Sequence, residues 1–188
     1  MDVGRLEQIV LTTPLTLEVV EGLQCGQRVL LNGIVYTARD AAHKKLTECI
    51  MLGLELPFDL AGQVIYYVGP TPAKPGRIIG SAGPTTSGRM DAFAPQLYAG
   101  GLKATIGKGR RSPEVIEAMR QYKGVYMAAV GGAAALISRC IKESNLVAFP
   151  ELGPEAVHAL TVVNFPVFVV NDVSGRDLYD ENANKFKA

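Results

Sequence analysis

The sequence predicts one α/β domain with a mixed sheet over residues 1–188, and three observations support this. Apolar runs rich in β-branched residues alternate along the chain with stretches that carry helical caps and helical spacing. The length suits a single domain with a sizeable core, and a composition of 48% hydrophobic and 20% charged residues is typical of a globular protein. No internal repeat is visible, and the polar segment 172–188 is predicted to be a peripheral tail.

The predicted strands are short apolar segments bounded by glycine, proline or asparagine. They cover residues 28–36, 63–68, 104–107, 125–130, 146–149 and 167–170. The first is interrupted at Asn32-Gly33, a pair that favours a hairpin turn.

The predicted helices begin at capping residues or prolines and end near glycines. They cover residues 15–23, 37–52, 91–98, 113–122, 133–140 and 154–160. Thr13 is expected to cap the first helix because Pro14 follows it, and Ser112 is expected to cap the fourth because Pro113 follows it. Gly53 is expected to close the second helix.

The stretch 80–91 combines three glycines, four hydroxyl side chains and one arginine, and this predicts a site loop. Glycines let the backbone approach a ligand closely, and hydroxyls with an arginine can bind an anion. A plain surface connection can have the same composition, so this alternative stays open for the loop taken alone.

Three polar clusters lie at predicted element ends, where site residues of α/β proteins are usually placed. The clusters are Arg39-Asp40, Thr85-Thr86-Arg89 and Lys108-Arg110-Arg111. Because an arginine fork matches carboxylate geometry, several convergent cations with hydroxyls predict a pocket for a small dianion such as a dicarboxylate.

The two histidines are interpreted as structural. His43 lies four residues after Arg39, on the same helix face, and a helix-capping or hydrogen-bonding role is favoured over proton transfer. His158 lies in a predicted apolar helix with no other reactive side chain nearby in the sequence.

Composition also argues against several function classes. Cys25, Cys49 and Cys140 have neither CxxC spacing nor an adjacent histidine pair, so they are expected to be reduced, packed thiols rather than metal ligands. A net charge of +1, without aromatic residues among the basic ones, argues against nucleic-acid binding. No window approaches the ~20 apolar residues of a membrane span and no secretory signal is visible, so a cytoplasmic protein is expected.

Six segments of the chain carry long motifs with a familiar order and spacing. They are VYTARDAAHK at 35–44, YVGP at 67–70, GSAGPTTSGRMD at 80–91, IGKG at 106–109, VGGAAA at 130–135 and ELGPEA at 151–156. Together they resemble the β subunit or C-terminal domain of class I fumarases and of the related L-tartrate dehydratases.

The resemblance implies an iron-sulfur hydro-lyase that interconverts fumarate and (S)-malate, built on a swivelling three-layer β/β/α domain. It also implies that a [4Fe-4S] cluster is bound by cysteines of a partner α subunit and not by this chain. The chain would then be inactive alone, within an α2β2 assembly. The alternatives are the β subunit of an L-tartrate dehydratase and, outside this class, a non-catalytic dicarboxylate-binding module.

The resemblance also assigns roles by motif. Thr85 would be the base that removes the C3 proton, with Asp40 and His43 supporting the binding of substrate through Arg39. The group that binds the substrate carboxylates would consist of Arg39, Thr86, Arg89 and Lys108. Arg110 and Arg111, beside Lys108, are interpreted as surface charges.

Overall fold

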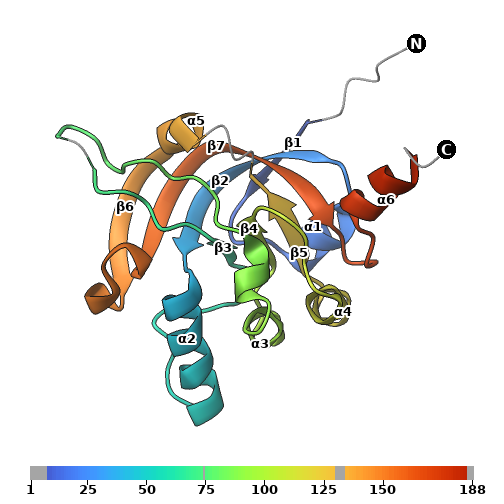
Figure 1. The fold of residues 1–188 in the computed structure, drawn as a ribbon, viewed down its shortest axis with the longest axis horizontal. Helices are drawn as coiled ribbons and strands as arrows, with labels where there is room; N and C mark the ends of the chain where they lie inside the picture. Colours follow the sequence, from blue (N-terminus) through green and yellow to red (C-terminus); the bar gives the residue numbers. More distant parts are fainter. Residues whose placement is uncertain (1–7, 74, 130–133, 186–188) are drawn as a thin grey trace.

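A mixed sheet forms the centre of the computed structural model, which describes residues 8–73, 75–129 and 134–185 (Figure 1). Its strands are β1 (Gln8–Thr12), β2 (Arg28–Thr37), β3 (Val64–Tyr66), β4 (Ala104–Gly107), β5 (Val125–Ala128), β6 (Ile141–Ala148) and β7 (Val157–Asn171). Their order in the sheet is β1-β2-β3-β4-β5-β7-β6, and β7 also pairs with β2. Because β7 pairs with both β2 and β5, the sheet curls and is partly closed into a barrel.

Strands β1 to β5 are parallel to one another. Strand β7 is antiparallel to its three partners, β2, β5 and β6. The carboxyl ends of β2, β3, β4 and β5 therefore lie along one edge of the sheet. In open α/β sheets this edge is where ligands bind.

The helices are α1 (Leu17–Gly22), α2 (Asp40–Leu52), α3 (Ala94–Ala99), α4 (Pro113–Tyr122), α5 (Ala134–Cys140) and α6 (Leu178–Lys185). Two 3₁₀ helices, η1 (Ser87–Met90) and η3 (Pro150–Glu155), lie in the connections. Helices α2, α3 and α4 lie together on one side of the strands, as Figure 1 shows. No helix in the described part of the chain is long and apolar enough to cross a membrane.

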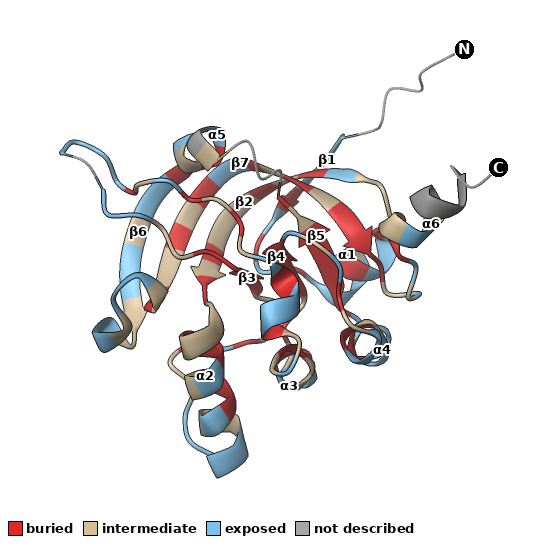
Figure 2. Ribbon diagram, viewed as in Figure 1, coloured by how far each residue is buried: buried red, intermediate tan, exposed pale blue. Residues whose placement is uncertain are grey.

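Alternating side chains of the strands divide the interior into two apolar clusters. On β3, Val64 and Tyr66 point into the curled sheet. Ile65 and the residue that follows β3, Tyr67, pack instead with residues of α2, α3 and α4. Figure 2 shows the buried residues concentrated on the strands and on the helix faces that meet them. This packing gives a layer of helices on a curled sheet, as an α/β prediction requires.

Several local predictions are confirmed. Strand β4 has the predicted bounds, and α4 begins after Ser112, whose hydroxyl accepts a hydrogen bond from the Val115 amide at 3.4 Å. Helix α2 ends at Gly53, which adopts the left-handed conformation with φ 64°. The predicted strand 125–130 and helix 133–140 are present as β5 and α5, and residues 130–133 lie outside the described residues.

The predictions for Thr13 and Asn32-Gly33 are wrong. The hydroxyl of Thr16, not Thr13, caps α1, since it accepts from the Val19 amide at 3.3 Å. The Thr13 hydroxyl instead donates to the carbonyl of Ile34 at 2.7 Å. Strand β2 continues through Asn32-Gly33 with a bulge, where Gly33 has φ 98°, because β7 pairs with residues on both sides of it.

The prediction of a helix at 154–160 is also wrong. The chain forms the 3₁₀ helix η3 and then strand β7, a strand of 15 residues that contains His158. Both edges of this segment are paired, with β2 on one side and β6 on the other, and this pairing decides its conformation. The His158 amide donates to the Thr37 hydroxyl at 2.9 Å.

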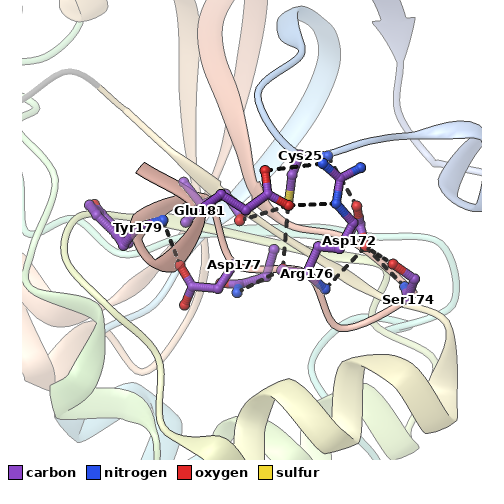
Figure 3. Close-up of polar contacts among 9 residues, drawn as sticks. Cys25, Asp172, Ser174, Arg176, Asp177, Tyr179 and Glu181 are labelled. Atoms are coloured by element: carbon purple, nitrogen blue, oxygen red, sulfur yellow. Dashed lines mark hydrogen bonds and ion pairs between the residues drawn. The ribbon is translucent and has the colours of Figure 1, made fainter. Parts of the chain in front are cut away.

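The segment expected to be a peripheral tail begins inside the fold, because Asp172 and Asp177 are buried. Figure 3 shows the polar contacts of this segment. The Asp172 carboxylate accepts from the amides of Cys25 at 3.1 Å and Ser174 at 3.0 Å, and from the Ser174 hydroxyl at 2.6 Å. Burial by itself raises the pKa of a carboxyl, but these hydrogen bonds outweigh it and hold the pKa of Asp172 below its ordinary value. Arg176 then binds Glu181 of α6 through two hydrogen bonds, at 2.6 and 3.0 Å.

Candidate active site at the carboxyl edge of the sheet

The backbone brings Thr85, Thr86 and Lys108 together at the carboxyl ends of β3 and β4. The Thr85 amide donates to the Tyr67 carbonyl at 2.7 Å, and the Lys108 amide donates to the Thr85 carbonyl at 3.2 Å. The Ser87 amide donates to the Lys108 carbonyl at 2.9 Å. Thr86 and Lys108 thus form one further parallel β-bridge beyond the end of β4. Thr86 and Lys108 are exposed at this edge, and Thr85 is half-buried.

Arg39 reaches the same edge from the end of β2, where it precedes α2. Its Nη2 lies 3.4 Å from Oε1 of Glu155, and the other oxygen of Glu155 accepts from the Ala41 amide at 3.0 Å in the first turn of α2. The Arg39 side chain runs along the backbone of Gly69, where a Cβ atom would lie 2.5 Å from Nη1. Glu155 and Gly69 thus fix the path of this arginine.

Asp40 lies between Arg89 and Arg39. The Arg89 Nε donates to Asp40 Oδ1 at 2.9 Å, and Arg89 Nη2 forms an ion pair with Oδ2 at 2.9 Å. The same Oδ2 lies 3.8 Å from Nε of Arg39. The Asp40 carboxylate therefore lies between the two guanidinium groups and holds them at one edge.

The charge at this edge is positive. Three cations, Arg39, Arg89 and Lys108, lie there with two carboxylates, Asp40 and Glu155, and both carboxylates pair with arginines. No carboxylate of the described residues forms an ion pair with Lys108. The arrangement can therefore attract a small anion and present it to exposed hydroxyl and ammonium groups.

His43 lies beneath Arg39 and is fully buried. Its Nδ1 lies 2.9 Å from the Arg39 carbonyl, so the neutral ring carries its proton on Nδ1 and donates it there. The pKa of His43 is lowered to about 4, mainly by burial and to a smaller extent by the nearby Arg111 cation, while the hydrogen bond to Arg39 partly opposes the shift. A neutral, buried ring packed against Tyr67 can position Arg39, and its single N–H proton is bonded to the Arg39 carbonyl rather than to a ligand.

The depressed pKa of His43 predicts a specific pH dependence of stability. Between about pH 6.5 and pH 4 the unfolded chain binds a proton at this histidine and the folded chain does not, so stability falls as pH falls, by up to ~1.4 kcal/mol per unit. We expect His43→Asn to have a flatter profile of unfolding free energy over this range, measured by urea denaturation. Burial also lowers the pKa of His158, which is less buried than His43, so His158→Asn is the comparison variant and should flatten the profile less than His43→Asn does. Equal slopes in wild type and His43→Asn would contradict the prediction.

The interpretation of Arg111 as a surface charge is wrong. Its side chain is 0% exposed and its Nε donates to Asp91 Oδ1 at 2.8 Å. Arg110 is exposed as expected and pairs with Asp180 of α6. The sequence carries no local signal that separates these two neighbouring arginines, because only the tertiary structure buries one of them.

Glu155 is a second residue whose role sequence reasoning missed. It lies in the motif at 151–156, and its proximity to Arg39 depends on the connection η3, which was predicted as the start of a helix. A cavity of about 340 Å³ lies elsewhere, between the loop after β3 and the pair β6–β7, and includes His158 and Ser144 in its lining. The predicted site residues form an open edge and do not line this cavity.

The sulfur atoms of Cys25 and Cys140 contact backbone carbonyls. The Sγ of Cys25 donates to the Val170 and Arg176 carbonyls at 3.0 and 3.3 Å, and Sγ of Cys140 contacts the Asn164 carbonyl at 3.6 Å. Burial and the nearby Asp172 carboxylate raise the pKa of Cys25 to about 12. Among the described residues no three histidine, cysteine or acidic side chains are grouped as ligands of a metal ion. The donor set of these residues therefore does not fit an iron-sulfur cluster.

Comparison with known proteins shows the family to which this chain belongs. The family model described as Fumarase C-terminus matches residues 2–182, and the chain belongs to this family. It is 42% identical over 158 residues to fumarate hydratase 2 of Leishmania major, and 41% identical over 160 residues to the anaerobic class I fumarate hydratase of Escherichia coli. These alignments cover 83% and 84% of this chain, which spans only 28% and 29% of the two relatives.

A third relative has about the length of this chain. It is a Methanocaldococcus jannaschii protein, provisionally named the beta subunit of L(+)-tartrate dehydratase, with 41% identity over 173 residues. The alignment covers 89% of each of the two chains. In this family, then, the unit described here occurs both as part of a longer protein and as a separate chain.

Proposed function

We propose that this chain is the β subunit of a class I fumarate hydratase, a hydro-lyase that interconverts fumarate and (S)-malate. The observation that carries the proposal is the meeting of Arg39, Arg89 and Lys108 at one open edge, beside the hydroxyl-bearing loop at Thr85-Thr86. Three cations match two carboxylates of a small substrate, and an open edge fits a site that a second subunit completes.

We assign each residue of this edge a role in binding, in proton removal or in holding another residue in place. Arg39, Arg89 and Lys108 bind the substrate carboxylates, and Thr86 assists with its hydroxyl or amide. Thr85 removes the proton from C3, a role that requires activation by neighbouring cations because a threonine hydroxyl is a weak base. Asp40, Glu155 and His43 hold Arg39 and Arg89 in place.

The family relatives are iron-sulfur enzymes, and the thiols of this chain do not fit a cluster. We therefore assign the [4Fe-4S] cluster to a partner α subunit, in a cytoplasmic α2β2 assembly. The chain would act as a swivelling three-layer β/β/α domain against that subunit. The relative from M. jannaschii is named as a beta subunit, and this name supports a two-subunit arrangement.

The second candidate is an L-tartrate dehydratase β subunit, favoured by the name of the same relative. The two substrates are four-carbon dicarboxylates that differ in hydroxyl groups, so the same cations suit both.

Reconstitution tests the proposed function. The chain is purified anaerobically and assayed for fumarate hydration, alone and then mixed with an α subunit whose cluster is intact by absorbance. We expect activity only in the mixture, since the chain supplies half of the site; heat-denatured chain in the same mixture is the control. Turnover of tartrate instead of malate would favour the second candidate. Inactivity on both substrates, together with calorimetric binding of a dicarboxylate by the chain alone, would overturn the assignment in favour of a non-catalytic module.

A further inference from the structure

Arg111 lies under the candidate site, in a cage of polar and aromatic groups. Its Nη1 donates to the Thr105 hydroxyl at 2.9 Å and to the Tyr67 hydroxyl at 3.2 Å. Its guanidinium carbon lies 5.3 Å from the ring centroid of Tyr67 and 5.0 Å from that of Tyr126. A buried charge is costly unless it is paired and hydrogen-bonded, so this cation is fixed in place by Tyr67, which follows β3, and by residues of β4 and β5.

Tyr126 connects this cation to both loops of the candidate site. Its hydroxyl donates to the Gly109 carbonyl at 2.9 Å, next to Lys108. The Tyr126 hydroxyl has one proton, so the Ser87 hydroxyl, 2.9 Å away, donates to it. Ser87 follows Thr86 directly, and one tyrosine therefore holds the residues beside Thr86 and beside Lys108.

The side chain of Ser87 packs tightly against the backbone of β4. A Cβ atom at Gly107 would lie 2.0 Å from Oγ of Ser87, so this hydroxyl packs directly on the backbone of β4. Ser87 is fully buried, while Thr86 beside it is exposed. The buried hydroxyl fixes the loop, and the exposed hydroxyl stays free to meet a ligand.

Arg111 also holds the other end of the same turn. The 3₁₀ helix η1 carries Arg89 and runs from Ser87 to Met90, and Asp91 follows it. Asp91 accepts from Arg111 Nε through Oδ1, and from the Ser112 amide at 2.7 Å through Oδ2. The turn that carries Arg89 is thus anchored at one end through Tyr126 and at the other directly by Arg111.

We propose that Arg111 is a positioning residue, which sets the placement of Thr85, Arg89 and Lys108 through Tyr126, Ser87 and Asp91. The proposal rests on the function proposed above. It gives the buried arginine a role in catalysis that a stabilising core residue would not have, because small displacements of reacting groups reduce turnover strongly.

The experiment separates positioning from stability with three variants in the assembled enzyme. Arg111→Lys keeps the charge but cannot reach Asp91, Thr105 and Tyr67 together, and Tyr126→Phe keeps the ring but removes the link to Ser87 and Gly109. Thr13→Val is the matched control, because it removes a buried hydroxyl that donates to the Ile34 carbonyl of β2 at 2.7 Å and contacts neither Arg111 nor the site loops. Circular dichroism and size exclusion give the folded, assembled fraction of each variant.

We expect kcat per folded complex to fall about tenfold or more in Arg111→Lys and Tyr126→Phe, with a smaller change in KM and no change in kcat for Thr13→Val. Hydrogen exchange of the full chain gives a second measurement that does not depend on activity. Amides at 85–91 and 108–109 should exchange about tenfold faster in Tyr126→Phe than in Thr13→Val.

Unchanged kcat together with unchanged exchange in Tyr126→Phe would overturn the positioning role, and this variant decides the question if Arg111→Lys does not fold. An inactive wild-type complex would count against the proposed function instead. In that case the exchange measurement alone decides whether Arg111 and Tyr126 order the two loops.

Discussion

Replacing Thr85 by valine is expected to lower kcat of the assembled enzyme by about 100-fold or more, because general-base catalysis contributes 10²–10⁴. Valine keeps the β-branched shape, and the backbone bonds of Thr85 to Tyr67 and Lys108 do not involve the side chain, so the loop should keep its conformation. The loss would then report the hydroxyl alone. The measurement is steady-state dehydration of malate by the reconstituted complex.

Two further variants sharpen this prediction. Thr85→Ser keeps a hydroxyl and should retain much of the activity, whereas Thr86→Val removes the neighbouring exposed hydroxyl and should raise KM more than it lowers kcat. Deuterium at C3 of malate should slow turnover in Thr85→Ser if proton removal limits the rate. A kcat for Thr85→Val within threefold of wild type would show that another group is the base.

Parts of the fold could be predicted from the sequence where local signals suffice. Strand β4 and helix α4 have the expected bounds because a short apolar run and a Ser-Pro-Glu start each carry their own signal. The amino-terminal half of β7 has no such signal, since Pro154 suggests a helix start. Pairing of this segment with β2 and β6, both distant in sequence, overrides that local suggestion.

The candidate site was predictable to a similar degree. Arg39, Arg89 and Lys108 stand at element ends, and parallel strands bring such ends to one edge, so their meeting follows from the alternation of strands and helices. The sequence could not distinguish Arg110 from Arg111, because burial of Arg111 depends on Tyr67 and Tyr126, which are distant from it in the sequence. Supporting contacts of this kind come from tertiary packing, which one sequence does not reveal.

Replacing Arg89 by alanine is expected to lower kcat/KM for fumarate about tenfold or more, since a charge-assisted contact is worth ~1.5–3 kcal/mol. In the structure Asp40 takes up Nε and Nη2 of Arg89, so the opposite side of the guanidinium, with Nη1, is left to bind a substrate carboxylate. The alanine variant removes this group and leaves Asp40 near only Arg39, at 3.8 Å. Steady-state kinetics of the reconstituted complex provide the measurement.

The matched control for Arg89 is Arg110→Ala. Both arginines are about half exposed, 51% and 53% for their side chains, and each pairs with one aspartate, but the partner of Arg110 lies on α6, away from the loop at Thr85. Arg110→Ala should therefore leave kcat/KM unchanged, while Arg89→Lys, which keeps the charge but loses the fork, should fall between wild type and alanine. The inhibition constant of a saturated four-carbon dicarboxylate should rise in the same order, because it measures carboxylate binding without chemistry. Equal losses in Arg89→Ala and Arg110→Ala would mean that the edge acts only through its total charge and that Arg89 makes no direct contact with substrate.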